Sequence, residues 1–241
     1  MPEPLVTDRR ARTPAPSAPQ VLQRLRALAD RSRLAGMARY GIATEHAYGV
    51  TVAELRMLAR ELGRNHVLAH ALWGSGVHEA RVLAGMIDDP SLVDAEQMDR
   101  WAEDFDSWDL CDQVCANLFR RTPLANAEVR EWTGRREPFV KRAGFALIAG
   151  LTVADKHAPD ERFAGFLPLI AREADDERQI VRKGVSWALR QIGKRDRHLN
   201  ALAIDIALEL RGRTSRAARW VGADALRELH STRVQENLTP A

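Results

Sequence analysis

The sequence predicts an all-α protein of HEAT-like repeats, in which helix pairs stack into a curved α-solenoid with a concave basic face. Two observations carry this prediction. Almost every segment between the two ends places apolar residues at helical spacing, and no convincing alternating strand occurs. Similar helices also recur with a period of about 40 residues, which is typical of HEAT-like repeats. A generic helical bundle is the alternative.

The recurring helices lie mainly in the second half of the chain. Residues 140–146 and 181–187 are 41 positions apart, and each has an apolar residue, two basic residues and then two small or apolar residues. Residues 219–229 align with residues 182–192 at an offset of 37, and both contain Ala-Leu-Arg. Residues 80–84 are a weaker relative. Helices this rich in small residues allow their neighbours to approach closely.

The two ends differ in composition from the rest. Residues 1–19 contain five prolines and few large apolar side chains, so burial there cannot compensate for the entropy of ordering. We therefore expect a flexible tail over residues 1–19, a repeat domain over residues 20–231 and a second flexible tail over residues 232–241.

Several classes of protein are disfavoured. The apolar runs are too short to cross a membrane, and no secretory segment follows the start, so we expect a cytoplasmic protein. Cys111 and Cys115 are four residues apart and are interpreted as small helix residues rather than metal ligands. His66 and His70 share that spacing, but the glutamate of a zinc-protease helix is missing. We expect no metal and no cofactor.

The charge is unevenly distributed. The chain carries a net charge of +3, to which residues 1–119 contribute −4 and residues 120–241 contribute +7. This asymmetry favours an acidic partner such as nucleic acid for the second half. A composition bias without functional meaning is the alternative.

The helix predicted over residues 107–120 carries an unusual carboxylate. One apolar ridge consists of Leu110, Val114 and Leu118, and a neighbouring ridge consists of Trp108, Asp112, Cys115 and Phe119. On this second ridge Asp112 is expected to be partly desolvated, which raises its pKa unless a cation or hydrogen bonds compensate. Asp112 is therefore either a reactive carboxylate or a buried partner of an arginine in the next repeat.

The helix predicted over residues 179–194 carries a tryptophan among cations. Its core residues are Val181, Val185, Leu189 and Ile192, and another face presents Lys183, Trp187, Arg190 and Lys194. Cations beside an aromatic ring suit phosphates and a sugar or base. Basic residues also occur in the related helices, namely Lys141, Arg142 and Arg219. Equivalent positions of stacked repeats line one surface, so we expect a basic stripe. A solvated exterior face is the alternative.

In these residues the sequence resembles the AlkD-like DNA alkylation repair glycosylases, all-helical proteins of HEAT-like repeats. The resemblance extends from about residue 40 to residue 229. It is carried by the segment Trp108-Asp109-Leu110-Cys111-Asp112, by Arg142, and by Trp187-Ala188-Leu189-Arg190 on a later repeat. Residues 37–40 and 49–56 are similar to the entry region of the family.

The resemblance implies removal of N3- and N7-alkylated purines from double-stranded DNA, without a tight pocket for the base. Asp112 matches the catalytic carboxylate, and Trp108 and Trp187 match the aromatic residues that flank the deoxyribose. Arg142 matches the cation that holds the backbone near the lesion. Further DNA contacts are assigned to Lys183, Arg190, Lys141, Arg219 and Tyr40.

The chemistry agrees with this assignment. An alkylated purine already carries positive charge and leaves readily, so the protein need only stabilise the charge that develops on the sugar. No lysine on an apolar face is placed to form a Schiff base, so we expect base removal without strand cleavage. We also expect the protein to be a monomer. Two alternatives from other classes remain: a noncatalytic repeat protein that binds damaged or branched DNA, and a protein-interaction solenoid.

Overall fold

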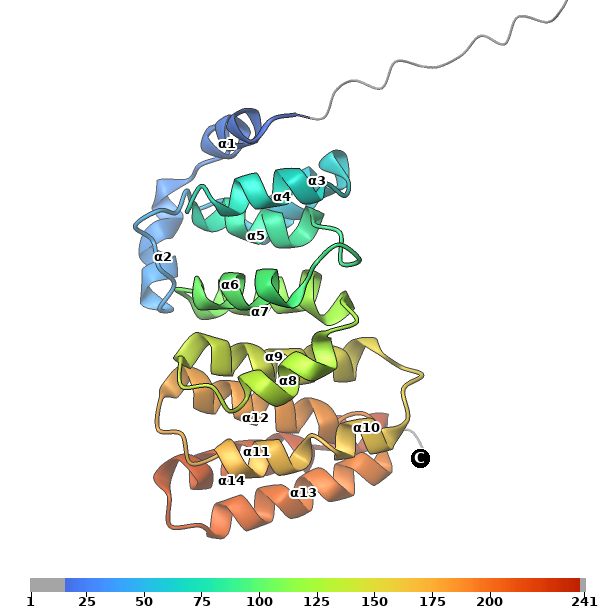
Figure 1. The fold of residues 1–241 in the computed structure, drawn as a ribbon. Coiled ribbons are helices and arrows are strands. Elements are labelled where there is room, and N and C mark those ends of the chain that lie inside the picture. Colours follow the sequence, from blue (N-terminus) through green and yellow to red (C-terminus); the bar gives the residue numbers. More distant parts are fainter. Residues whose placement is uncertain (1–15, 239–241) are drawn as a thin grey trace, which may run out of the picture.

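All regular secondary structure in the computed structural model, which describes residues 16–238, is helical (Figure 1). The first half contains α1 (Ala18–Ala27), η1 (Arg31–Arg33), α2 (Leu34–Arg39), α3 (Val52–Leu62), α4 (His66–Trp73), α5 (His78–Ile87), α6 (Ala95–Glu103) and α7 (Trp108–Asn117). The second half contains η2 (Phe119–Arg121), α8 (Ala125–Trp132), α9 (Pro138–Ala154), α10 (Asp160–Ala164), α11 (Leu167–Glu173), α12 (Gln179–Gly193), α13 (Arg197–Gly212), α14 (Arg216–Leu229) and α15 (Thr232–Asn237). Within these helices no stretch has both the length and the hydropathy to cross a bilayer.

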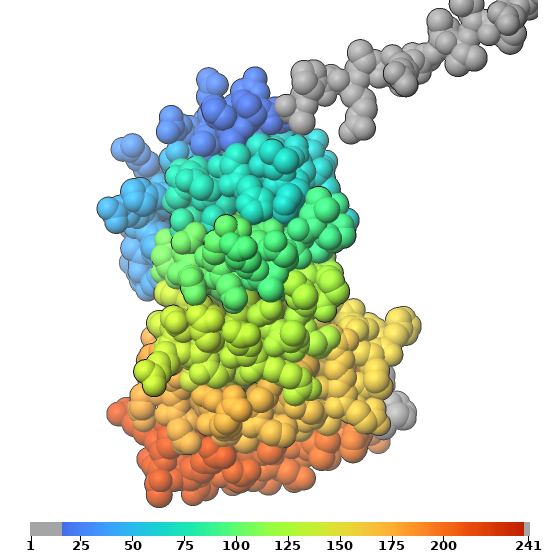
Figure 2. Space-filling view, viewed as in Figure 1, coloured from blue at the N-terminus to red at the C-terminus, as the bar shows by residue number. Residues whose placement is uncertain are grey.

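The helices stack as the repeat pattern predicts. One layer is formed by α3, α5, α7, α9, α12 and α14, each of which packs on the next. Helices α4, α8, α11 and α13 pack on α5, α9, α12 and α14 respectively, which gives the second layer. The space-filling view shows the same succession from the N-terminal to the C-terminal end (Figure 2). The related segments found in the sequence belong to α9, α12 and α14, so they occupy equivalent places in the first layer.

The core confirms the helix faces. The side chains of Leu110, Val114, Val181, Val185, Leu189 and Ile192 are fully buried. Close approach of helices requires glycine at two positions. A Cβ atom at Gly222 of α14 would lie 2.4 Å from the Ala207 carbonyl oxygen, and one at Gly144 of α9 would lie 2.8 Å from the Thr133 amide nitrogen.

The segment between α1 and α3 differs from the repeats. Residues 26–48 contain no buried side chain. Figure 1 shows α2 lying along one side of the stack, next to the helix ends. Hydrogen bonds from the stack hold it there, including His78 N to His46 O at 3.0 Å and Trp108 Nε1 to Tyr40 O at 2.8 Å.

Both predicted domain boundaries need adjustment. The expected C-terminal tail of residues 232–241 instead contains α15, because Val234 and Leu238 have apolar side chains that are 8% exposed and pack as part of the folded protein. The first helix begins at Ala18, where the Ser17 amide donates to Gln20 Oε1 at 2.8 Å. The rest of the expected N-terminal tail, residues 1–15, lies outside the described residues.

Candidate nucleic-acid interface

The centre of the site is an ion pair between two neighbouring helices of the first layer. Arg142 of α9 donates from Nε to Asp112 Oδ1 at 2.9 Å and from Nη2 to Asp112 Oδ2 at 2.7 Å. Its third donor, Nη1, bonds the Ile180 carbonyl oxygen of α12 at 2.7 Å. The Arg142 side chain is 8% exposed and that of Asp112 is 18% exposed. Arg142 therefore links three successive repeats and fixes the carboxylate in a two-bond geometry.

The position of Asp112 follows from where α7 begins. The helix starts at Trp108, directly after Ser107, and its first turn already contains the fully buried Leu110 and Cys111. Farther along the same ridge Cys115 and Phe119 are fully packed, whereas Trp108 and Asp112 are half-buried. The N-terminal end of this ridge therefore lies at the candidate site, and its C-terminal end lies in the core. The sequence-based expectation that Asp112 is partly desolvated is confirmed, and its partner is an arginine of the next repeat.

Burial and ion pairing shift the pKa values of Asp112 and Arg142 in opposite directions. Burial raises the pKa of the Asp112 carboxyl above its ordinary value, although the charge and hydrogen bonds of Arg142 oppose this. For Arg142, burial lowers the pKa, but the charge and hydrogen bonds of Asp112 outweigh it and the pKa is raised. The charge on the carboxylate therefore depends on Arg142.

A cavity of about 300 Å³ opens beside this pair. It is lined by Tyr40, Gly41, Trp108, Arg142, Gln179, Ile180 and Lys183. The Arg142 guanidinium lies 5.9 Å from the centre of the Trp108 ring, and the indole Nε1 donates to the Tyr40 carbonyl oxygen at 2.8 Å. The ring of Trp108 therefore lies between the buried ion pair and the segment that carries α2.

Four of the residues singled out in the sequence meet at this cavity: Trp108, Arg142, Lys183 and Tyr40. Tyr40 is 73% exposed, and Lys183 is exposed with no ion pair among residues 16–238. Neither Asp112 nor Trp187 is among the lining residues, and Asp112 reaches the cavity only through its partner Arg142. Trp187 lies one helical turn beyond Lys183 on α12 and packs partly against the core.

One residue expected to contact DNA, Lys141, is bonded within the protein instead. The Lys141 amine is buried and bonds Glu173 Oε2 at 2.7 Å and Asp176 Oδ2 at 3.3 Å. This placement corrects the expectation that Lys141 contacts DNA, because its ammonium group is bonded to two carboxylates of the protein.

The basic face of α12 is also balanced by acids. Arg190 pairs with Glu228 and lies 3.5 Å from Asp224, and Lys194 bonds Glu228 at 2.6 Å. The predicted stripe is therefore interrupted by carboxylates of α14. Arg219 stays exposed, and its Nη1 donates to the Thr214 carbonyl oxygen at 2.7 Å.

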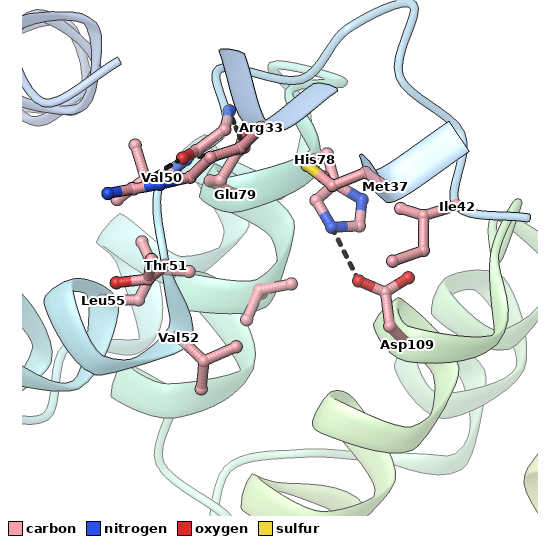
Figure 3. A pocket seen from close by; sticks show the side chains of 12 residues that line it. Arg33, Met37, Ile42, Val50, Thr51, Val52, Leu55, His78, Glu79 and Asp109 are labelled. Carbon is pink, nitrogen blue, oxygen red and sulfur yellow. Dashed lines mark hydrogen bonds and ion pairs between the residues drawn. The ribbon is translucent and has the colours of Figure 1, made fainter. Parts of the chain in front are cut away.

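A second cavity, also of about 300 Å³, lies on the other side of the α2 segment (Figure 3). Met37 and Ile42 of that segment line it, opposite His78 of α5 and Asp109 of α7. His78 Nε2 lies 3.0 Å from Asp109 Oδ2. The remaining atoms, His78 Nδ1 and Asp109 Oδ1, are buried without a partner among the described residues. Figure 3 shows both of these atoms on the side of Ile42.

This histidine–aspartate pair is the part of the region that sequence reasoning missed. Burial disfavours the charged form of His78, but the hydrogen bond and charge of Asp109 outweigh it, so the pKa of His78 is raised. The same pairing overcomes burial at Asp109 and lowers its pKa. No local spacing signals this pair, because the two residues are 31 positions apart in the chain.

The comparisons with known proteins agree with this architecture. The model of a family described as DNA alkylation repair enzyme matches residues 21–229. No curated protein matches the chain. One solved structure, described as "A new family of proteins related to the HEAT-like repeat DNA glycosylases with affinity for branched DNA structures", is similar with a TM-score of 0.74. The two chains are 18% identical, and the match covers 93% of this chain and 98% of that chain. At this identity the likeness establishes the fold.

Proposed function

Because the chain belongs to the family of DNA alkylation repair enzymes, we propose that it is a DNA glycosylase that removes positively charged N3- and N7-alkylated purines from double-stranded DNA. The observation that carries the proposal is the two-bond pair between Asp112 and Arg142. It lies beside Trp108, at a cavity that also presents the unpaired Lys183.

The geometry supports a defined role for each group. Each carboxylate oxygen of Asp112 receives one hydrogen bond from Arg142, and a carboxylate oxygen can accept two. A free lone pair on each oxygen thus remains for the sugar or for an attacking water. As the bond to the purine breaks, positive charge develops on the deoxyribose. The fixed negative charge of Asp112 and the ring face of Trp108 stabilise it.

The surrounding residues suit the DNA backbone. Lys183 is exposed at the rim of the cavity and is free to neutralise a phosphate. Tyr40 is exposed at the opposite wall and can contact a sugar or phosphate. In this scheme Arg142 acts through Asp112, because all of its donor groups named above bond protein atoms. Trp187 and Arg219 are proposed to extend the contact along α12 and α14.

The test is release of free base from methylated double-stranded DNA. We expect wild type to release 7-methylguanine or 3-methyladenine, and Asp112→Asn to release it about 10²–10³-fold more slowly while DNA affinity stays similar. Asp205→Asn is the matched control, because Asp205 is an exposed aspartate on α13. No release by wild type under conditions where it binds the DNA contradicts the proposal.

A second function is favoured by two observations. The similar solved structure is described as having affinity for branched DNA, and Trp108 is tied to the Tyr40 carbonyl rather than free at the surface. On this alternative the chain binds branched or damaged DNA without cleaving the base, and Asp112 only orients Arg142. Tighter binding of a four-way junction than of a linear duplex, together with no base release, favours the alternative.

A further inference from the structure

We propose that His66, His70 and Asp88 form a binding site for a divalent transition-metal ion such as Zn²⁺. The three side chains can each supply a ligand atom, and these atoms lie within 4.8 Å of one another. The site is separate from the Asp112 region, and the proposal does not depend on the proposed glycosylase function.

Two neighbouring helices bring the ligands together. His66 and His70 are four residues apart on α4, so they occupy one face of that helix. Asp88 follows directly after α5, where it is the C-cap residue. The histidine spacing alone is weak evidence in the sequence. The fold supplies the third ligand from a position 18 residues farther along the chain.

The carboxylate is already held in place. The Asp88 side chain is fully buried, and its Oδ2 accepts a hydrogen bond from Gln97 Nε2 at 2.6 Å. Its Oδ1 accepts from the Asp89 amide at 2.7 Å and lies 2.7 Å from His66 Nδ1. Fixed outer partners of this kind are what orients the ligands of metal sites.

His70 is oriented but has no hydrogen-bond partner. Its ring packs edge-on against His66, with ring centres 4.5 Å apart, and against Trp101 at 5.6 Å. Within residues 16–238 no hydrogen bond involves its ring nitrogens. Two imidazoles and a carboxylate favour Zn²⁺, Co²⁺, Ni²⁺ or Cu²⁺ over Mg²⁺ or Ca²⁺, and three protein ligands leave a coordination position for water.

Binding has a defined proton balance. The metal takes the place of the proton between His66 Nδ1 and Asp88 Oδ1, and the neutral imidazole then carries its one N–H proton on Nε2. Bonds of about 2.0–2.2 Å at tetrahedral angles separate two ligand atoms by roughly 3.3 Å, so the His66 ring moves outward by a few tenths of an ångström. The metal then ties the first turn of α4 to the end of α5 and, through Gln97, to α6.

The experiment uses the full chain with any affinity tag removed, treated with a chelator and then titrated with Zn²⁺ by calorimetry. We expect one ion to bind per chain. We also expect a rise in the melting temperature with Zn²⁺ but not with Mg²⁺. Bound Co²⁺ should give the visible absorption of a low-symmetry nitrogen and oxygen site.

The decisive variant is His70→Gln, since it leaves the His66–Asp88 hydrogen bond intact. We expect its Zn²⁺ affinity to fall at least about tenfold. His198→Gln is the matched control, because His198 is exposed on α13. The proposal is overturned if wild type fails to bind Zn²⁺ stoichiometrically, or if His70→Gln and His198→Gln bind it equally well. Unchanged circular dichroism of His70→Gln establishes that the variant is folded.

Discussion

Two carboxylate–cation clusters in the same helix layer differ in how completely their charges are satisfied. Between α7 and α9, Asp112 is bonded by Arg142 alone, next to an indole ring and a cavity. Between α12 and α14, Glu228 is bonded by both Arg190 and Lys194, while Asp224 receives Ser186 Oγ at 2.7 Å. Each carboxylate accepts one hydrogen bond on each of its oxygens, but Asp112 balances one cation whereas Glu228 balances two. Charge excess in the second half of the chain therefore does not locate the site.

The largest difference between the clusters should appear in stability. Arg142→Ala leaves Asp112 buried without a cation, and we expect the free energy of unfolding to fall by about 3–5 kcal/mol. Arg190→Ala leaves Lys194 on Glu228, and we expect a loss of about 1 kcal/mol or less. Urea unfolding measures both. Equal losses for the two variants would show that a second cation on the carboxylate does not protect stability.

A buried carboxylate that forms no ion pair within residues 16–238 extends the comparison. Glu128 of α8 is 6% exposed, and burial together with the charges of Asp99 and Glu131 raises its pKa to about 7 against the opposing charge of Arg135. The folded state keeps this proton up to about pH 7, whereas the unfolded chain loses it near the ordinary value of 4.5. Its contribution to stability is therefore full below pH 4.5 and is lost as the pH rises through 7.

Glu128→Gln tests this pH dependence, because the amide resembles the protonated carboxyl. We expect little change in stability at pH 4.5 and a gain on the order of 2 kcal/mol at pH 8. Urea unfolding at the two pH values provides the measurement. Glu177→Gln, at an exposed position, is the control and should gain nothing at either pH. A gain that is the same at both pH values contradicts the assignment.

The Asp112–Arg142 cluster also adjoins Trp108, which a hydrogen bond ties to the α2 segment. Trp108→Phe removes the hydrogen bond from Nε1 to the Tyr40 carbonyl, and we expect a loss of about 1 kcal/mol. Amide hydrogen exchange should accelerate around residues 34–41 more than in α12. Trp220→Phe is the control, since its indole N–H bonds no described residue. Unchanged exchange near Tyr40 would mean that other contacts hold the segment.

The smallest effect concerns DNA affinity. Lys183→Gln should reduce the slope of log K against log salt by about 0.9, the value of one phosphate contact. Lys194→Gln should leave the slope nearly unchanged, because Lys194 is committed to Glu228. Binding of a fluorescent duplex at several salt concentrations measures both slopes. Equal reductions would place both lysines on the DNA.

The sequence predicts features that depend on spacing within one helix. The core faces of α7 and α12 and the equivalence of α9, α12 and α14 follow from periodicity, and the structure confirms them. It could not distinguish a free cation from a paired one. Lys141 finds its acids 32 and 35 residues away, and Arg190 finds Glu228 at 38 residues. His78 and Asp109 are likewise 31 residues apart. Such partners are set by the stacking of helices, which local patterns do not encode.

The segment of residues 26–48 has a consequence for how proteins of this architecture diversify. It places Tyr40 and Gly41 on one cavity and Met37 and Ile42 on the other, yet it buries no side chain. Its sequence can therefore vary in length and chemistry without disturbing the repeats that fold beneath it. A library randomised within this segment would change the side chains that line both cavities and leave the packed repeats unchanged.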